Sequence, residues 1–147
     1  VHQLYFQKQL SKWELKASNP PGSGKLVDWT SEEYLDSPVY NIWAREKMTT
    51  SWNFEIMLCD FENDEWVYRR NRNIRGPIHE FDWQTKEGIK VIAPEIQLLY
   101  KSRNPREKDF FDFQNCMKIF SVEKKLKLKM LLEADSGLNH PWLKLIF

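Results

Sequence analysis

The chain has 147 residues, enough for one ordinary domain, and its 22 Lys and Arg residues balance 21 Asp and Glu residues. The net charge of +1 excludes the basic excess typical of nucleic-acid-binding domains, and 41% hydrophobic residues exclude disorder by composition. No apolar run approaches the roughly 20 residues of a membrane-spanning helix, so neither nucleic acid nor a membrane is an expected partner. Two widely separated cysteines, Cys59 and Cys116, favour a reduced, cytoplasmic protein.

Apolar and polar residues alternate in the first part of the sequence, with the period of half-buried strands. Before this alternation begins, Leu4, Phe6, Leu10 and Trp13 among Gln and Lys predict an amphipathic helix at 4–13. The alternation predicts strands at 13–17, 39–44, 52–58, 65–70 and 89–92, and the residues 18–24, rich in Gly and Pro, predict a loop. The polar residues 46–51 between two of these strands predict a β-hairpin.

From residue 94 onward the period becomes helical. The predicted helix starts are at Pro94, Asn104 and Ser121, and the last long helix is predicted to end at Gly137. A short helix at 140–147 closes the chain. The sequence therefore predicts one α+β domain, strand-rich over 13–92 and helical over 94–147.

Two suggestive motifs have simpler explanations. Gly22-Ser23-Gly24-Lys25 is similar to part of a phosphate-binding loop, but Asn19 and Leu26 stand where that motif needs a glycine and a hydroxyl. A surface loop is the better interpretation. Lysines alternate with leucines over 124–129, and acidic residues bracket them, so a solvated helix face is favoured over a membrane-binding one.

Glu55 is a candidate functional residue because it stands inside the apolar strand 54–58. A carboxylate in such a strand is costly unless it points at water, a partner or a metal. The simplest explanation is that the apolar neighbours face the core and Glu55 faces the solvent.

Cations gather around the predicted corner between the first two C-terminal helices. Lys101 and Arg103 end one helix, and Lys108 begins the next. Such a corner suits a polyphosphate. The alternative is that these cations stabilise a helix C-terminus and pair with Asp109 and Asp112.

The residues around this corner form an ordered pattern with other parts of the chain. It consists of Ala93-Pro94-Glu95, Leu98-Leu99-Tyr100-Lys101, Arg103, Pro105-Arg106, Lys108-Asp109 and Asp112-Phe113, together with the stretches 42–45, 52–58, 66–70, 74–77 and 140–143. This pattern resembles the aminoglycoside-adenylyltransferase-like members of the nucleotidyltransferase superfamily. The resemblance spans nearly the whole chain.

The resemblance implies a nucleotidyltransferase-like mixed or antiparallel sheet followed by C-terminal helices. It also implies transfer of a nucleoside monophosphate from a nucleoside triphosphate (NTP) to a hydroxyl of a small acceptor, such as an aminoglycoside. Two Mg²⁺ ions held by three carboxylates would support the reaction. Glu55 matches the third carboxylate, a metal ligand or catalytic base, and Lys101, Arg103 and Lys108 match the cations expected near the triphosphate.

The chain departs from the family pattern ahead of Glu55. The family has a Gly-Gly or Gly-Ser turn followed by an Asp-x-Asp pair, whereas Gly22-Ser23 is not followed by paired acids and Asp60-Phe61-Glu62 comes after the Glu55 strand. We therefore expect this chain to be the C-terminal part of a longer nucleotidyltransferase, unable to bind two metals and inactive by itself.

Two other functions stay open. A non-catalytic module could bind a ligand or protein in an aromatic cleft formed by Trp43, Trp52, Trp66 and Trp83, and a purely structural domain could form a dimer through exposed apolar surface. If the chain binds a cationic acceptor, the candidate contacts are Asp60, Asp64, Glu65, Trp43 and Trp66.

Overall fold

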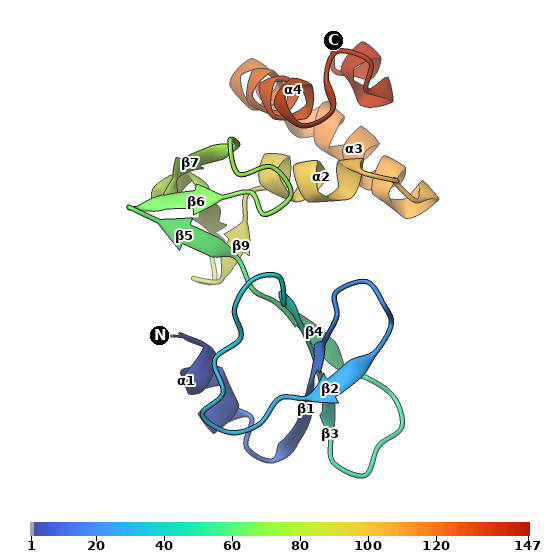
Figure 1. The fold of residues 1–147 in the computed structure, drawn as a ribbon. Coiled ribbons are helices and arrows are strands. Elements are labelled where there is room, and N and C mark those ends of the chain that lie inside the picture. The colour runs from blue at the N-terminus through green and yellow to red at the C-terminus, as the bar shows by residue number, and fades with distance from the viewer. Residues whose placement is uncertain (1) are drawn as a thin grey trace. The chain divides into compact units, whose positions relative to one another are not determined.

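The computed structural model describes residues 2–147, and the chain divides after Cys59 into two compact units (Figure 1). Helices and antiparallel sheets make up the fold, so the predicted α+β class is confirmed. The division does not coincide with the predicted change from strands to helices at residue 94. Within the described part of the chain, no helix has the length and apolar character needed to cross a membrane.

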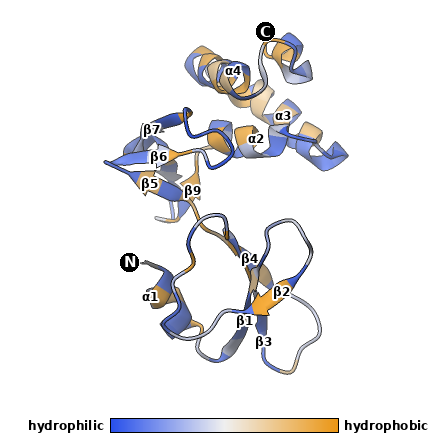
Figure 2. Ribbon diagram, viewed as in Figure 1, coloured by the Kyte–Doolittle hydropathy of each residue, from blue (hydrophilic) through white to orange (hydrophobic). Residues whose placement is uncertain are grey.

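The N-terminal unit, up to Cys59, is built on a four-stranded antiparallel sheet of order β2-β1-β3-β4. Its elements are α1 (His2–Gln9), β1 (Trp13–Ser18), β2 (Leu26–Asp28), β3 (Asn41–Glu46) and β4 (Phe54–Met57). The predicted hairpin is confirmed as β3 and β4. The sequence did not predict β2, a three-residue strand that stands out as apolar in Figure 2.

One face of this sheet carries the core of the N-terminal unit. Ala17 and Ile42 pack there against Trp29, Leu35 and Val39 of the segment between β2 and β3. Alternate residues of the strands therefore face away from this core.

Helix α1 is held by polar contacts rather than by the apolar face that the sequence suggested. The Gln3 side chain donates to the Leu35 carbonyl at 2.8 Å and accepts from the Leu35 amide at 2.9 Å. Leu4 and Phe6 are 43% and 42% exposed. The two glutamine bonds anchor the helix to the loop that covers the core.

The C-terminal unit, residues 60–147, contains a three-stranded antiparallel sheet of order β5-β6-β7, a hairpin of β8 and β9, and helices. Its elements are β5 (Asp60–Glu62), β6 (Glu65–Val67), β7 (Arg75–Pro77), the 3₁₀ helix η1 (Ile78–Glu80), β8 (Asp82–Gln84), β9 (Lys90–Ile92), α2 (Pro94–Ser102), α3 (Glu107–Ile119), α4 (Val122–Ser136) and the 3₁₀ helix η2 (Pro141–Leu145). The predicted strand at 65–70 is β6, and it belongs to a sheet separate from the β3–β4 hairpin.

Helix α2 contributes to two apolar clusters of this unit. Leu99 packs with Trp66 and Tyr68 beside the sheet, whereas its neighbour Leu98 packs with Phe113 and other residues of the helices. In Figure 1, α2 accordingly lies between the strands β5–β7 and the helices α3 and α4.

The predicted starts of α2 at Pro94 and of α4 after Ser121 are confirmed, since the Ser121 hydroxyl accepts from the Lys124 amide at 3.3 Å. The predicted start at Asn104 is wrong. Helix α3 begins at Glu107, because the Asp109 carboxylate accepts from the backbone amide of Arg106 and caps the helix there.

Candidate functional site

Glu55 lies on the polar face of the N-terminal sheet. Across the β3–β4 pair it stands opposite Trp43, and Asn41 stands opposite Met57. Since alternate residues share a face, Asn41, Trp43 and Glu55 lie on the side opposite to the core residue Ile42. The sequence prediction that Glu55 points away from the core is consistent with this register.

A hollow of about 420 Å³ opens on this face. It is lined by Ser18, Gly22, Gly24, Leu26, Asn41, Trp43, Trp52 and Glu55. The Gly-rich loop thus borders a candidate ligand site, although it lacks the sequence of a phosphate-binding loop. Glu55 provides the negative charge among these lining residues.

The orientation of Glu55 is set by Asn41. The Asn41 side-chain amide Nδ2 donates a hydrogen bond to Glu55 Oε1. The structure records no further hydrogen bond or ion pair for Glu55 among the described residues, so Oε2 is available to a ligand. A fixed carboxylate with one available oxygen can accept a proton or bind a cation.

Two indole rings form the apolar wall of the hollow. The ring centroids of Trp43 and Trp52 are 6.3 Å apart with an interplanar angle of 56°. Arg45 lies over the Trp52 ring at 4.6 Å and makes two hydrogen bonds with Glu14, at 2.7 and 2.9 Å. These bonds lower the pKa of Glu14 and raise that of Arg45.

The predicted cation Lys101 is neutralised within the α2–α3 corner. Its Nζ pairs with Asp112 Oδ2 and lies 3.5 Å from Asp109 Oδ1. The hydrogen bond with Asp112 is the main cause of the raised pKa of Lys101. The contacts of Lys101 therefore agree with the alternative that this cation pairs with Asp109 and Asp112.

Arg103 and Lys108 have different neighbours. The Arg103 guanidinium donates to the Asp135 carboxylate of α4 through Nε at 2.9 Å and Nη2 at 2.5 Å. Lys108 is exposed and has no ion pair among the described residues. Lys101, Arg103 and Lys108 therefore share no partner among the described residues.

The other predicted acceptor contacts belong to the C-terminal unit. Asp60 pairs with Arg72 at 2.9 Å, and Asp64 occupies the turn between β5 and β6. Trp66 is 1% exposed in the core, so its ring has no ligand-accessible face in this structure, whereas Trp83 is 48% exposed. Of the aromatic residues considered, Trp43 and Trp52 share a hollow.

The hollow does not fit a pair of magnesium ions. Across residues 2–147, the structure contains no group of three His, Cys, Asp or Glu side chains that could hold a metal ion. Glu55 supplies one carboxylate, and the other oxygen-bearing side chains of the hollow are Ser18 and Asn41. Two-metal sites need several carboxylate ligands, so we assign no metal-dependent step to these residues.

Several functionally placed residues were not singled out in the sequence. Asn41 could have been found from the hairpin register, because it lies on the same face as Glu55. Asp135, the partner of Arg103, is 32 residues away in the chain, and no local pattern connects them.

Comparison with known proteins identifies no family for this chain. No family model, curated protein or solved structure was found to match this chain.

Proposed function

We propose that this chain functions in nucleotidyl transfer to a small hydroxylated acceptor, and that the Glu55 hollow binds the acceptor. The observation that carries the proposal is the Glu55 carboxylate, held by Asn41 through Oε1 and beside two indoles in an open hollow. The resemblance of residues 42–45, 52–58 and 93–113 to the aminoglycoside-adenylyltransferase-like proteins supports the same chemistry.

In this proposal Glu55 acts as the general base. The acceptor hydroxyl gives its proton to Oε2 while its oxygen forms a bond to the α-phosphorus of the NTP. The bond from that phosphorus to pyrophosphate breaks, and pyrophosphate leaves with the electron pair. A positioned base of this kind contributes about 10²- to 10⁴-fold to a rate.

The aromatic wall of the hollow suits the acceptor. A sugar-like ring presents C–H groups that pack on the indoles of Trp43 and Trp52 and polar groups that reach Asn41 and Glu55. An amino group on the acceptor would also be attracted by the Glu55 charge.

The test is pyrophosphate release by the protein expressed from its complete reading frame, with Mg²⁺, each common NTP and a panel of aminoglycosides and related hydroxylated compounds. We expect acceptor-dependent release, and a loss of about 10²- to 10⁴-fold in Glu55→Gln. Glu46→Gln, an exposed carboxylate on the same sheet outside the hollow, is the matched control and should keep the wild-type rate.

Either of two results would contradict the proposal. One is the absence of pyrophosphate release with every NTP and acceptor. The other is a full rate in Glu55→Gln.

The hollow also supports a second candidate, a non-catalytic binding module. The observation that favours it is the single carboxylate among the lining residues, which does not fit a two-metal site. Quenching of tryptophan fluorescence by acceptors separates the two functions. A module would bind its ligand equally with and without Mg²⁺ and would release no pyrophosphate.

A further inference from the structure

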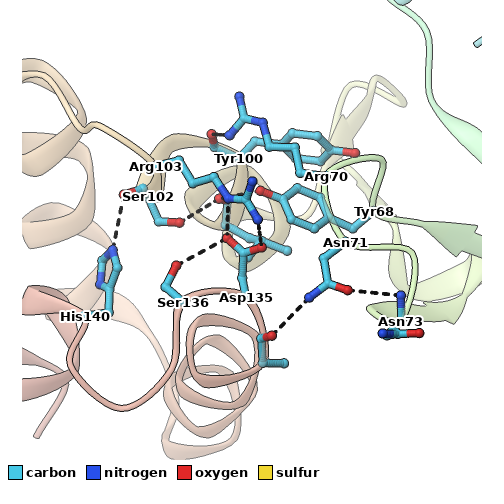
Figure 3. A network of polar contacts seen from close by, with 12 residues as sticks. Tyr68, Arg70, Asn71, Asn73, Tyr100, Ser102, Arg103, Asp135, Ser136 and His140 are labelled. Atoms are coloured by element: carbon cyan, nitrogen blue, oxygen red, sulfur yellow. Dashed lines mark hydrogen bonds and ion pairs between the residues drawn. The ribbon is translucent and has the colours of Figure 1, made fainter. Parts of the chain in front are cut away.

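The C-terminal unit carries a second polar cluster where β6, α2 and α4 meet (Figure 3). Tyr68 directly follows β6, Arg70 lies in the turn after it, Arg103 follows α2, and Asp135 is in the last turn of α4. We call Arg70 and Arg103, which lie on either side of the buried Tyr68 hydroxyl, the arginine corner. Figure 3 shows the Tyr68 hydroxyl directed towards the Arg103 guanidinium.

Arg103 is held in a fixed orientation. Its Nε and Nη2 donate to Asp135, whose side chain is 0% exposed, while Arg103 itself is 41% exposed. The guanidinium thus covers the buried carboxylate and separates it from solvent. Nη1 makes none of these bonds and is left to donate elsewhere.

Arg70 contributes a positive charge that no carboxylate in the described part of the chain balances. Its Nη1 donates to the Tyr100 carbonyl at 2.8 Å, and the structure gives it no acidic partner among the described residues. Two guanidinium groups and one carboxylate give the corner a net charge of +1. Both arginines are accessible to a ligand, because Arg70 is exposed and Arg103 is partly exposed.

The Tyr68 side chain lies close to both arginines. Its side chain is completely buried and packs edge-on against Tyr100 at 4.9 Å, and its hydroxyl donates to the Leu99 carbonyl at 3.5 Å. Burial raises the pKa of Tyr68, so the phenol stays uncharged at neutral pH and does not cancel the charge of the arginines. Arg70 and Arg103 lower the pKa of Tyr68, as expected if both guanidinium groups lie close to its hydroxyl.

We propose that the arginine corner binds a phosphate oxyanion. Guanidinium groups match the geometry of phosphate oxygens and keep their charge at all ordinary pH values. Lys101, which the sequence suggested for phosphate binding, is instead neutralised by Asp109 and Asp112. That the phosphate belongs to an NTP rests on the proposed function, whereas the oxyanion site rests on its own contacts.

The test is a titration of the purified protein with inorganic pyrophosphate and phosphate, followed by calorimetry and by backbone amide shifts. We expect saturable binding with shifts at Tyr68, Arg70 and Arg103. Arg70→Gln should weaken pyrophosphate binding roughly tenfold or more, as the loss of one charge-assisted hydrogen bond implies. Arg70→Lys should bind more tightly than Arg70→Gln because it keeps the charge.

Arg72→Gln is the matched control. Arg72 lies in the same turn but is already paired with Asp60 and Glu62, so this variant should bind pyrophosphate like the wild type. Unchanged amide spectra away from the corner establish that each variant is folded. The proposal is overturned if pyrophosphate does not bind saturably, or if Arg70→Gln and Arg72→Gln weaken binding equally.

Failure of this proposal and failure of the proposed function can be distinguished. Pyrophosphate binding without nucleotidyl transfer would leave the oxyanion site standing and refute the function. Transfer that is unaffected by Arg70→Gln, with no pyrophosphate binding at the corner, would refute the site alone.

Discussion

At the scale of single residues, Asn41 determines which oxygen of Glu55 is available. Its amide donates to Oε1 from the neighbouring strand, so the carboxylate presents Oε2 to the hollow. The alternation of strand residues predicted the exposed position of Glu55. It did not identify Asn41 as the partner, because that requires knowing the register of the hairpin as well as the pattern of one strand.

Asn41→Ala should reduce acceptor-dependent pyrophosphate release roughly tenfold, since one hydrogen bond to a charged group is lost. The bond is solvent-exposed, so the free energy of unfolding should change by less than about 1 kcal/mol. Rate measurements and urea unfolding on the same preparation check both parts. A variant with the wild-type rate would show that Glu55 needs no orienting partner.

Gly76 is the second residue with a testable role. A Cβ atom at this position would lie 2.9 Å from Trp66 Nε1, inside the core of the C-terminal unit. Gly76→Ala should therefore destabilise the protein by about 1 to 3 kcal/mol, as overpacked cores do. Chemical unfolding followed by circular dichroism measures this change.

The Trp66→Phe substitution provides the control for Gly76→Ala. Phenylalanine lacks the indole nitrogen that the new Cβ would meet, so Gly76→Ala should cost less in the Trp66→Phe background than in the wild type. Equal costs in the two backgrounds would contradict the proposed contact.

At the scale of elements, the sequence predicted two helix starts from their cap residues but missed several short strands. Pro94 and Ser121 marked helix starts correctly because each acts through its own backbone or side chain. The missed strands β2, β5, β7 and β8 have three residues each, too few to display a period of two by themselves. Their pairing depends on distant partners. The equally short β6 and β9 were predicted because apolar residues, Tyr68 and Ile89, extend the pattern beyond them.

The corner between α2 and α3 depends on Asp109, whose side chain is 4% exposed. Its carboxylate accepts from the backbone and guanidinium of Arg106, and Lys101 lies 3.5 Å away. Hydrogen bonding with Arg106 holds the pKa of Asp109 far below its usual value. Asp109→Asn should therefore lower the free energy of unfolding by about 1 to 3 kcal/mol at pH 7.

The pH dependence of this contribution has a definite sign. A lowered pKa in the folded state stabilises the protein above the unfolded pKa of about 3.9, and the stabilisation is lost as the pH falls below that value. The difference between wild type and Asp109→Asn should accordingly be larger at pH 7 than at pH 2.5, as measured by urea unfolding. Asp112→Asn, with 47% of the Asp112 side chain exposed, is the control and should cost less than about 1 kcal/mol. A pH-independent difference for Asp109→Asn would contradict this account.

At the scale of the whole molecule, each unit has its own apolar core. Ala17, Ile42 and Trp29 belong to the N-terminal core, whereas Leu128 and Leu132 belong to a core of the C-terminal unit. The sequence predicted a single change of character at residue 94. It missed the division after Cys59 because strands occur on both sides of that point.

Leu128 is completely buried, so Leu128→Ala should destabilise the C-terminal unit by about 2 to 5 kcal/mol. Because the cores are separate, amide hydrogen exchange should accelerate in α2 to α4 and stay unchanged at Ala17 and Ile42. Equal acceleration in both units would mean that they unfold as one.

The most direct measurement of the central claim is mass spectrometry of the acceptor after incubation with the protein from its complete reading frame, an NTP and Mg²⁺. The account predicts that at least one hydroxylated acceptor gains one nucleoside monophosphate with the wild-type protein and with Glu46→Gln, and not with Glu55→Gln. An acceptor that stays unmodified with every NTP, or that is modified equally by Glu55→Gln, would contradict it.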